Sequence, residues 1–232
     1  MTEPADAIAM HSFATNRVDP EIVPVFGVTP DDPAGARFAG TAFCFGHPPW
    51  LLTAAHVLSP ERTYLVARPQ EAKDNSPYIS YAVEGVHSIP LYDAALLRVP
   101  SMSQRREILS LADPVQRNVE RGSDVWTMGF PLTEESWNPD SGLLRYSLQS
   151  RYLESYVTRV FRDSNQSGRA TIEIADVLPP GISGSPIVVR PGTQVIGIAQ
   201  GTYWCQYAGH SYGYGMATPV FAIHPEILKV AA

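Results

Sequence analysis

The chain has 232 residues, of which 44% are hydrophobic and 17% are charged, and its formal net charge is −6 at pH 7. This length suffices for one domain, or for two small ones, with a substantial hydrophobic core. The negative charge and the scattered lysines and arginines exclude nucleic acid as an expected partner. No segment reaches the ~20 apolar residues that a membrane-spanning helix requires, so we expect no membrane partner.

The first 16 residues contain acids and lack a continuous apolar stretch, so they do not have the pattern of a secretory signal peptide. The sequence contains two cysteines, Cys44 and Cys205. Secreted domains of this size usually contain several disulfides, so we interpret both cysteines as free thiols with structural roles. These features together predict a cytoplasmic protein.

Residues 1–20 are expected to be a flexible N-terminal arm. Beyond it, short apolar runs alternate with turn residues, and 17 glycines and 21 prolines are spread along the chain. This pattern is typical of all-β proteins. The strands predicted in the first half cover 22–28, 37–45, 50–53, 63–67, 78–86 and 94–99.

A polar connection over 113–124 leads into the second half of the chain. Pro225 suits the first turn of a helix, so a C-terminal helix is predicted over 225–230. Loops are expected at 132–143 and 162–169. The strands predicted here cover 125–129, one long strand or a hairpin pair within 144–161, and the hairpin formed by 187–189 and 195–199.

Three short segments contain residues that together suit nucleophilic catalysis. They are Thr53-Ala54-Ala55-His56, Asp93 within the apolar run 91–97, and Gly181-Ile182-Ser183-Gly184-Ser185-Pro186. A serine hydroxyl is a weak nucleophile, so it needs a histidine to accept its proton and a carboxylate to hold the imidazole in the right tautomer. Small residues precede the histidine, apolar neighbours are expected to bury the aspartate, and glycines flank the serine.

The order of these residues excludes the triad of an α/β-hydrolase, in which the serine precedes the acid and the histidine. The histidines that follow Ser183 are His210 and His224, and no aspartate or glutamate lies between the serine and either one. The segment is not a nucleophile elbow either, because that motif has glycine where Ser185 stands. Each segment alone is compatible with a turn or a core residue, but the three in this order favour a serine endopeptidase.

Residues 22–223 resemble the chymotrypsin/trypsin-like serine protease superfamily, and within it the bacterial V8-like and HtrA-like branches. The resemblance implies an all-β fold of two six-stranded antiparallel β-barrels packed around a shared active-site cleft, with a short C-terminal helix. The first barrel would span 21–112 and the second 125–232. Besides the three segments above, the resemblance includes the stretches GTAF at 40–43, MGFP at 128–131, GIA at 197–199 and GMATPV at 215–220.

The same resemblance implies a role for each candidate residue. His56 would be the general base and Asp93 its orienting acid, both in the first barrel. Ser183 of the second barrel, rather than the neighbouring Ser185, would be the nucleophile. The backbone N–H groups of Gly181 and Ser183 would form the oxyanion hole, for which a residue without Cβ is well suited. This chemistry needs no cofactor and no metal.

Two positions depart from the family pattern. Ile182 stands where trypsin-type zymogens have an aspartate that pairs with a newly freed N-terminus. Because that ion pair cannot form, we expect activity without N-terminal cleavage. Gln200 falls near a position where relatives often have a small residue that supports the acid.

A specificity pocket is expected between the segment before the serine and the strand after it. Val177 falls at its floor, where a preference for lysine or arginine requires a carboxylate. Ala199 falls where glutamate-specific V8-type enzymes have a histidine, and His210, Tyr212 and Tyr214 are expected on the far wall. We therefore expect small or medium apolar substrate side chains. The predicted lining residues are Val177, Leu178, Ala199, Gln200, Gly201, Thr202, Gly215 and Met216.

Two other functions remain compatible with these segments. One is a non-catalytic peptide-binding or scaffold module on the same fold, and the other is an esterase-like hydrolase that uses the same triad. The complete set of His56, Asp93 and Ser183 favours the endopeptidase over the module. The expected partner is a peptide or protein substrate, and a regulatory protein partner is left open.

Overall fold

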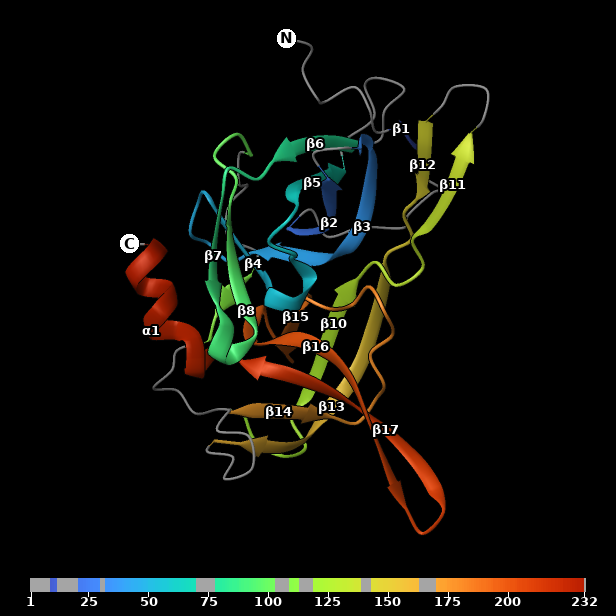
Figure 1. Ribbon diagram of the computed structural model, residues 1–232. Helices are drawn as coiled ribbons and strands as arrows, with labels where there is room; N and C mark the ends of the chain where they lie inside the picture. The colour runs from blue at the N-terminus through green and yellow to red at the C-terminus, as the bar shows by residue number, and fades with distance from the viewer. Residues whose placement is uncertain are drawn as a thin grey trace.

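Two large β-sheets contain most of the strands in the computed structural model of the protein (Figure 1). The structure describes residues 9–11, 21–29, 32–69, 78–102, 109–112, 119–138, 143–162 and 170–231. Most of the predicted N-terminal arm, part of the 113–124 connection and most of the 162–169 loop therefore lie outside the described residues.

The first sheet is antiparallel and has the strand order β6-β5-β2-β3-β4-β8-β7. The chain between β6 and β7 closes it, because the N–H of Val83 donates to Tyr64 O of β5 and the N–H of Glu84 donates to Arg98 O of β8. If β6 and β7 are counted as one bent strand, the ring has the six members predicted from the sequence. The strands are β2 (Ile22–Thr29), β3 (Asp32–Cys44), β4 (Trp50–Ala54), β5 (Thr63–Pro69), β6 (Tyr78–Ala82), β7 (Gly85–Ile89) and β8 (Ala94–Arg98).

The second sheet closes into a barrel because its strand β15 pairs with both β10 and β16. The short strand β9 adds to the edge of β16 in parallel orientation, although it precedes the boundary expected after residue 112. The strands are β9 (Ser110–Leu111), β10 (Asp124–Gly129), β13 (Arg151–Phe161), β14 (Thr171–Ile174), β15 (Pro186–Val189), β16 (Gln194–Tyr207) and β17 (His210–Pro219). Together, the two sheets confirm the predicted all-β, two-barrel architecture.

A small third sheet corrects the loop predicted over 132–143. It consists of β1 (Ala9–His11), β11 (Glu134–Asn138) and β12 (Leu143–Ser147), so a strand occupies a stretch whose polar composition is typical of a loop. Contacts with the first barrel stabilise β11 and its neighbour β12. Arg37 of β3 forms an ion pair with Glu135 at 3.3 Å, and the hydroxyl of buried Tyr146 donates to Ala36 O. Tertiary pairing therefore outweighs local strand propensity here.

The C-terminal helix α1 (Val220–Ala231) begins five residues earlier than predicted and contains Pro225. Its buried residues Val220, Ile223 and Ile227 recur at helical spacing and belong to a hydrophobic core cluster with members from both barrels. This burial outweighs the single backbone hydrogen bond that proline cannot donate. Within the described ranges, no helix is long and apolar enough to cross a membrane.

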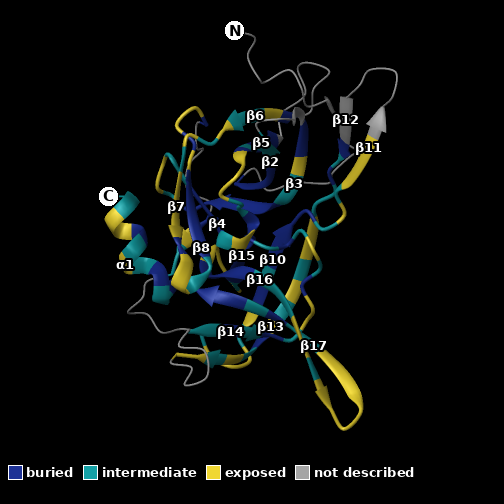
Figure 2. Cartoon of the chain, in the orientation of Figure 1, coloured by how far each residue is buried: buried dark blue, intermediate teal, exposed yellow. Residues whose placement is uncertain are grey.

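Buried side chains fill both barrels, whereas the outer end of the β16–β17 hairpin is exposed and projects from the body of the molecule (Figure 2). Cys44 is buried and Cys205 is half-buried, and no disulfide joins them, as predicted.

Candidate active site

Asp93 holds both the backbone and the ring of His56. The strand β4 ends at Ala54, and the 3-10 turn η2 (Ala55–Val57) that follows contains the histidine, so His56 lies at a strand end as predicted. Asp93 follows a second such turn, η3 (Pro90–Tyr92), and has the left-handed backbone angles φ 50° and ψ 46°. Its Oδ1 accepts the His56 backbone N–H at 2.8 Å, and its Oδ2 lies 2.7 Å from His56 Nδ1.

This pairing fixes the tautomer of the neutral imidazole. An ionised carboxylate can only accept hydrogen bonds, so Nδ1 carries the proton and Nε2 is left as the basic nitrogen. The hydrogen bond that Asp93 accepts from His56 is the main factor that raises the pKa of His56 above its ordinary value of 6.5, and burial opposes it. The charge of Asp93 and the polar side chain of Gln200 raise the pKa further.

Asp93 is less buried than the sequence predicted. The side chains of His56 and Asp93 are 43% and 29% exposed. The apolar run around Asp93 is interrupted, because Leu91 is exposed in η3 while residues 94–97 enter the core as β8. Hydrogen bonds, rather than apolar surroundings, therefore hold the carboxylate in place.

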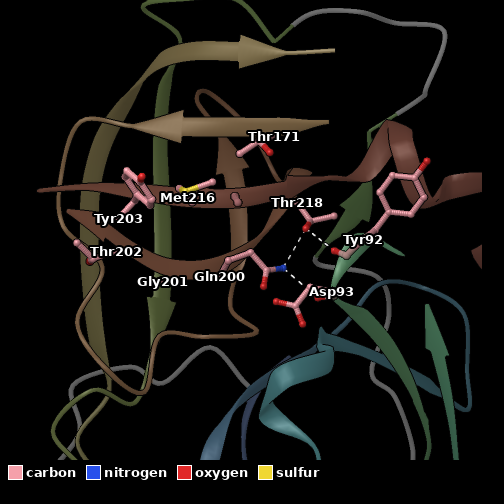
Figure 3. A pocket seen from close by; sticks show the side chains of 10 residues that line it. Tyr92, Asp93, Thr171, Gln200, Gly201, Thr202, Tyr203, Met216 and Thr218 are labelled. Carbon is pink, nitrogen blue, oxygen red and sulfur yellow. Dashed lines mark hydrogen bonds between the residues drawn. The ribbon is translucent and has the colours of Figure 1, made fainter. Parts of the chain in front are cut away.

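Gln200 connects Asp93 with the second barrel (Figure 3). Its Nε2 donates to Asp93 O and to Thr218 Oγ1, both at 3.0 Å, and Thr218 Oγ1 donates to Tyr92 O at 2.6 Å. Within the described part of the chain, Gln200 Oε1 is buried and has no hydrogen-bond partner. The small residue expected at this position is thus replaced by a side chain that anchors the segment bearing Asp93.

Ser183 lies in a tight turn held against the first barrel by Thr41. The Thr41 N–H donates to Ser183 O at 2.9 Å, and Thr41 Oγ1 donates to Gly181 O at 2.8 Å. Gly181 and Gly184 have φ angles of +92° and +86°, a region that L-residues rarely adopt. A Cβ on Gly184 would lie 2.0 Å from Thr41 O, so the close approach of the two barrels requires glycine there.

The backbone amides of this turn divide into two sets. Those of Ile182, Gly184 and Ser185 donate to Pro179 O, Ala199 O and Ile182 O. Among the backbone hydrogen bonds of the described residues, the amides of Gly181 and Ser183 donate none. These are the two groups that the sequence predicts for an oxyanion hole. The Ser183 hydroxyl itself donates to Gln200 O at 3.0 Å.

Ile182 occupies the position at which a trypsin-type zymogen has an aspartate that forms an ion pair. Its side chain is fully buried in the core of the second barrel with Val125, Val157 and Ile187. Ser185 is also fully buried, and in the described structure its hydroxyl has no hydrogen-bond partner. A hydroxyl enclosed in this way cannot reach a substrate, which agrees with the choice of Ser183 as the nucleophile.

The two walls of the predicted specificity pocket touch each other. The Leu178 N–H donates to Thr202 Oγ1 at 2.8 Å, and Thr202 Oγ1 donates to Leu178 O at 2.8 Å. The side chain of Leu178 lies against Gly215, so no substrate side chain can pass between the walls at this level. Val177 does not form a deep floor, because it is 45% exposed and lies beside Gly213 and Trp204.

The far wall assigned to His210, Tyr212 and Tyr214 also differs from the expectation. Gly213 and Gly215 turn toward Val177 and Leu178, and alternate residues of a strand point to opposite faces. The three aromatic side chains therefore lie on the face of β17 that is turned away from this pocket.

A cavity of about 260 Å³ lies on that other face, next to Asp93 and Gln200 (Figure 3). The sequence indicated no role for several of its lining residues. Four of the residues expected in the specificity pocket line this cavity instead, namely Gln200, Gly201, Thr202 and Met216. A Cβ on Gly201 would meet no atom within 4 Å. The GMATPV stretch was the one available signal, since it contains Ala217 and Thr218. The lining residues missed are Tyr92, Thr171, Tyr203, Ala217 and Thr218.

Comparisons with known proteins agree with this geometry. The family model described as "Trypsin-like peptidase domain" matches residues 40–198, a range that includes His56, Asp93 and Ser183. Among solved structures, the crystal structure of Deg5 is similar over 92% of this chain and 90% of that one, with a TM-score of 0.63 and 15% sequence identity. A search of curated proteins finds no match. Because the family model covers more than half of the sequence, the chain belongs to the trypsin-like peptidase domain family.

Proposed function

We propose that the protein is a serine endopeptidase that hydrolyses peptide bonds through a His56-Asp93-Ser183 triad and an acyl-enzyme. The observation that carries the proposal is the pair of hydrogen bonds that Asp93 accepts from His56, at 2.8 Å from the backbone N–H and at 2.7 Å from Nδ1. It directs the basic Nε2 of His56 away from the acid and keeps it free to accept a proton. A histidine retained for packing alone has no need of this arrangement.

In the proposed reaction the hydroxyl of Ser183 leaves Gln200 O, rotates toward His56 and attacks the substrate carbonyl. Nε2 of His56 accepts the serine proton and later gives it to the leaving amine. The N–H groups of Gly181 and Ser183, which donate to no other described backbone group, stabilise the oxyanion of the tetrahedral intermediate. Water then hydrolyses the acyl-enzyme by the same proton transfers in reverse.

The proposed enzyme is active without cleavage of its N-terminus. In a trypsin-type zymogen, the freed N-terminus orders the oxyanion loop through a buried ion pair. Here the corresponding residue is Ile182, which fills the apolar core of the second barrel. Apolar burial and the hydrogen bonds of Thr41 support an oxyanion loop that is already ordered.

The preferred substrate would have a small side chain before the scissile bond. The direct hydrogen bonds between Leu178 and Thr202 support this choice, because they leave no slot between the two walls. A buried charge would find no partner on Ala199 or Leu178, both of which are buried and apolar.

Covalent labelling with a fluorophosphonate tests the proposed function. The purified protein should react with the probe, and mass spectrometry should locate the adduct on Ser183. The Ser183→Ala variant should not react, and its turnover should fall by a factor on the order of 10⁶. Ser185→Ala is the matched control and should still react.

Two outcomes would replace the proposed function. A folded wild-type protein that does not react with the probe would favour a non-catalytic peptide-binding module. Labelling on Ser183 together with hydrolysis of esters but of no peptide in a library would favour an esterase.

A further inference from the structure

The β16–β17 hairpin carries most of its aromatic side chains along one of its faces, whereas Trp204, which is 63% exposed, lies on the other. The strands are antiparallel, and side chains of alternate cross-strand pairs share a face. We call the outer part of this face, residues 203, 205, 207, 210, 212 and 214, the tyrosine face. From the inner end of the hairpin to its tip, the pairs on this face are Gly201 with Met216, Tyr203 with Tyr214, Cys205 with Tyr212 and Tyr207 with His210.

Several of these rings are open to solvent. Tyr207 is 75% exposed, Tyr203 is 52% exposed and Tyr212 is 50% exposed. The rings of Tyr203 and Tyr214 lie 5.4 Å apart and those of His210 and Tyr212 lie 6.5 Å apart, and these two ring pairs follow one another along the same face of the hairpin. Figure 2 shows that the hairpin projects beyond the barrel, with its outer end exposed. Contiguous exposed aromatic surface of this kind marks interaction sites.

The tyrosine face is continuous with the candidate active site. The cross-strand pair Gly201 and Met216 lies directly inward of the tyrosine face, and both residues line the cavity beside Asp93 together with Tyr203 of the face itself. Gln200, the next residue inward, accepts the hydroxyl hydrogen bond of Ser183. Six residues separate Gly201 from Tyr207, which corresponds to about 20 Å of strand. A chain lying along this face therefore starts at the catalytic residues and ends at the hairpin tip.

The hairpin that carries the face offers no charged side chain to a ligand, and the two charges that act on Tyr214 from neighbouring strands, those of Glu173 and Arg159, are opposite in sign. Residues 194–219 include no aspartate, glutamate, lysine or arginine. Tyrosine rings with their hydroxyl groups bind prolines, aromatic side chains and peptide groups by flat contact and hydrogen bonding. An ionic ligand would find no opposite charge within this segment.

We infer that the tyrosine face binds an extended, uncharged segment of the polypeptide substrate, rich in proline and aromatic residues, several residues away from the scissile bond. This inference rests on the proposed endopeptidase function. Its particular claim is that recognition extends beyond the cavity to the tip of the hairpin, so that unfolded chains are better substrates than short peptides.

A lipid surface fits the face less well. Peripheral membrane segments combine aromatic residues with lysine and arginine that meet anionic headgroups, and this segment contains none. The tip itself consists of Ala208 and Gly209, neither of which is an anchor for a bilayer. Association of two copies through their hairpins is the other alternative, and the alkylation of Cys205 distinguishes it from peptide binding.

The test first identifies a short peptide that the wild-type protein cleaves, and then compares this peptide with longer peptides that contain the same cleavable segment. Two longer peptides add eight residues of proline, tyrosine, glycine and serine, one at the amino end and one at the carboxyl end. At least one longer peptide should be cleaved with a kcat/KM about tenfold above that of the short peptide. The Tyr207→Ser/Tyr212→Ser variant should lose this advantage while it cleaves the short peptide at the wild-type rate.

The matched control lies at the same distance from the catalytic residues on the opposite face of the hairpin. Gln206→Ala/Ser211→Ala should retain the full preference for the longer peptide. Circular dichroism checks the fold of both double variants, and the single variant Tyr207→Ser provides a second measurement with less perturbation. Equal kcat/KM values for the short peptide and both longer peptides in the wild type would overturn the inference.

A binding measurement is independent of catalysis. Cys205 lies within the tyrosine face and is half-buried, whereas Cys44 is buried in the core, so alkylation of Cys205 reports occupancy of the face. In the Ser183→Ala variant, the longer peptide should slow this alkylation at least fivefold, and the short peptide should not. If Cys205 is protected from alkylation without peptide, and this protection rises with protein concentration, the face is a contact between two copies and the inference is overturned. Protection by phosphatidylserine vesicles but not by peptide would overturn it in favour of a lipid surface. If no peptide is cleaved but protection is seen, the proposed catalytic function fails and the binding face stands.

Discussion

The side-chain Nε2 of Gln200 lies 3.0 Å from the backbone carbonyl oxygen of Asp93, a residue 107 positions earlier in the chain. The same carbonyl accepts the N–H of Ala55 at 3.0 Å. Asp93 is thus held by the second barrel through Gln200 and by the first barrel through Ala55 and His56. The strained, left-handed backbone of Asp93 is stabilised at the junction of the two barrels.

The first prediction concerns the pH dependence of the Gln200→Leu variant. The polar side chain of Gln200 helps to raise the pKa of His56, so it favours the protonated imidazole. Activity requires the neutral imidazole, so the wild-type rate should rise with pH around a midpoint above 6.5. The leucine variant should move this midpoint to lower pH. Its kcat/KM at high pH should fall about ten- to a hundredfold, because Asp93 is less well held.

Thr218→Val is the control for this variant. It removes one acceptor of Gln200 Nε2 and the donor to Tyr92 O, but leaves the hydrogen bond to Asp93 O. The midpoint of its pH–rate profile should stay at the wild-type value even if its thermal stability falls. A leucine variant with an unchanged or higher midpoint would show that Gln200 has only a structural role.

The second prediction concerns Asp93→Asn. The amide can accept one hydrogen bond from His56 and place an NH₂ group where the other accepting oxygen was, which favours the wrong imidazole tautomer. We expect kcat to fall by a factor on the order of 10⁴ with little change in fold. Glu84→Gln makes the same chemical change in a surface ion pair with Arg98 and should leave kcat unchanged. A loss below tenfold in Asp93→Asn would remove Asp93 from the proposed triad.

The sequence predicted correctly those structural features that depend on residues close together in the chain. Small residues before His56 permit the turn η2 to follow β4 directly, and the glycines around Ser183 have the positive φ angles that their type suggests. The alternation of apolar residues and turn residues was enough to predict an all-β chain, whereas the two barrels were implied by the family resemblance of the same short segments. These features are encoded within a few residues of one another.

Features that depend on distant residues were not predictable in the same way. The role of Gln200 arises from contact with Asp93 and Thr218, and nothing in the residues next to Gln200 indicates it. The strand β11 is polar and forms because it pairs with β12 and contacts Arg37 of β3. The contact of Leu178 with Thr202 depends on a side-chain hydroxyl that joins residues 24 positions apart. The specificity pocket was predicted from residue positions relative to Ser183, which do not indicate this contact, so the predicted pocket was deeper than the one in the structure.

The third prediction concerns the glycines of the serine turn. Gly184→Ala introduces a Cβ 2.0 Å from Thr41 O at a φ of +86°, so the turn must move away from β3. We expect the free energy of unfolding to fall by about 2 kcal/mol or more, because the left-handed backbone and the clash add. Gly85→Ala is the control, since the nearest atom to its new Cβ is 3.7 Å away, and should stay within about 0.5 kcal/mol of wild type. Equal denaturation midpoints for the two variants in urea would contradict this account of Gly184.

The last prediction concerns the wall contact between Thr202 and Leu178. In the wild type, a panel of peptides that differ only before the scissile bond should be cleaved fastest with alanine or another small residue there. Thr202→Gly removes the hydroxyl that bonds both Leu178 N and Leu178 O and frees the space between the walls. The ratio of kcat/KM for leucine over alanine should then rise about tenfold, the scale on which a pocket distinguishes a few methylene groups. Thr202→Val keeps the side-chain volume without the hydroxyl and should retain the preference for small residues. If the wild type already prefers leucine or phenylalanine, or if the glycine variant leaves the panel unchanged, the contact between Thr202 and Leu178 does not determine specificity.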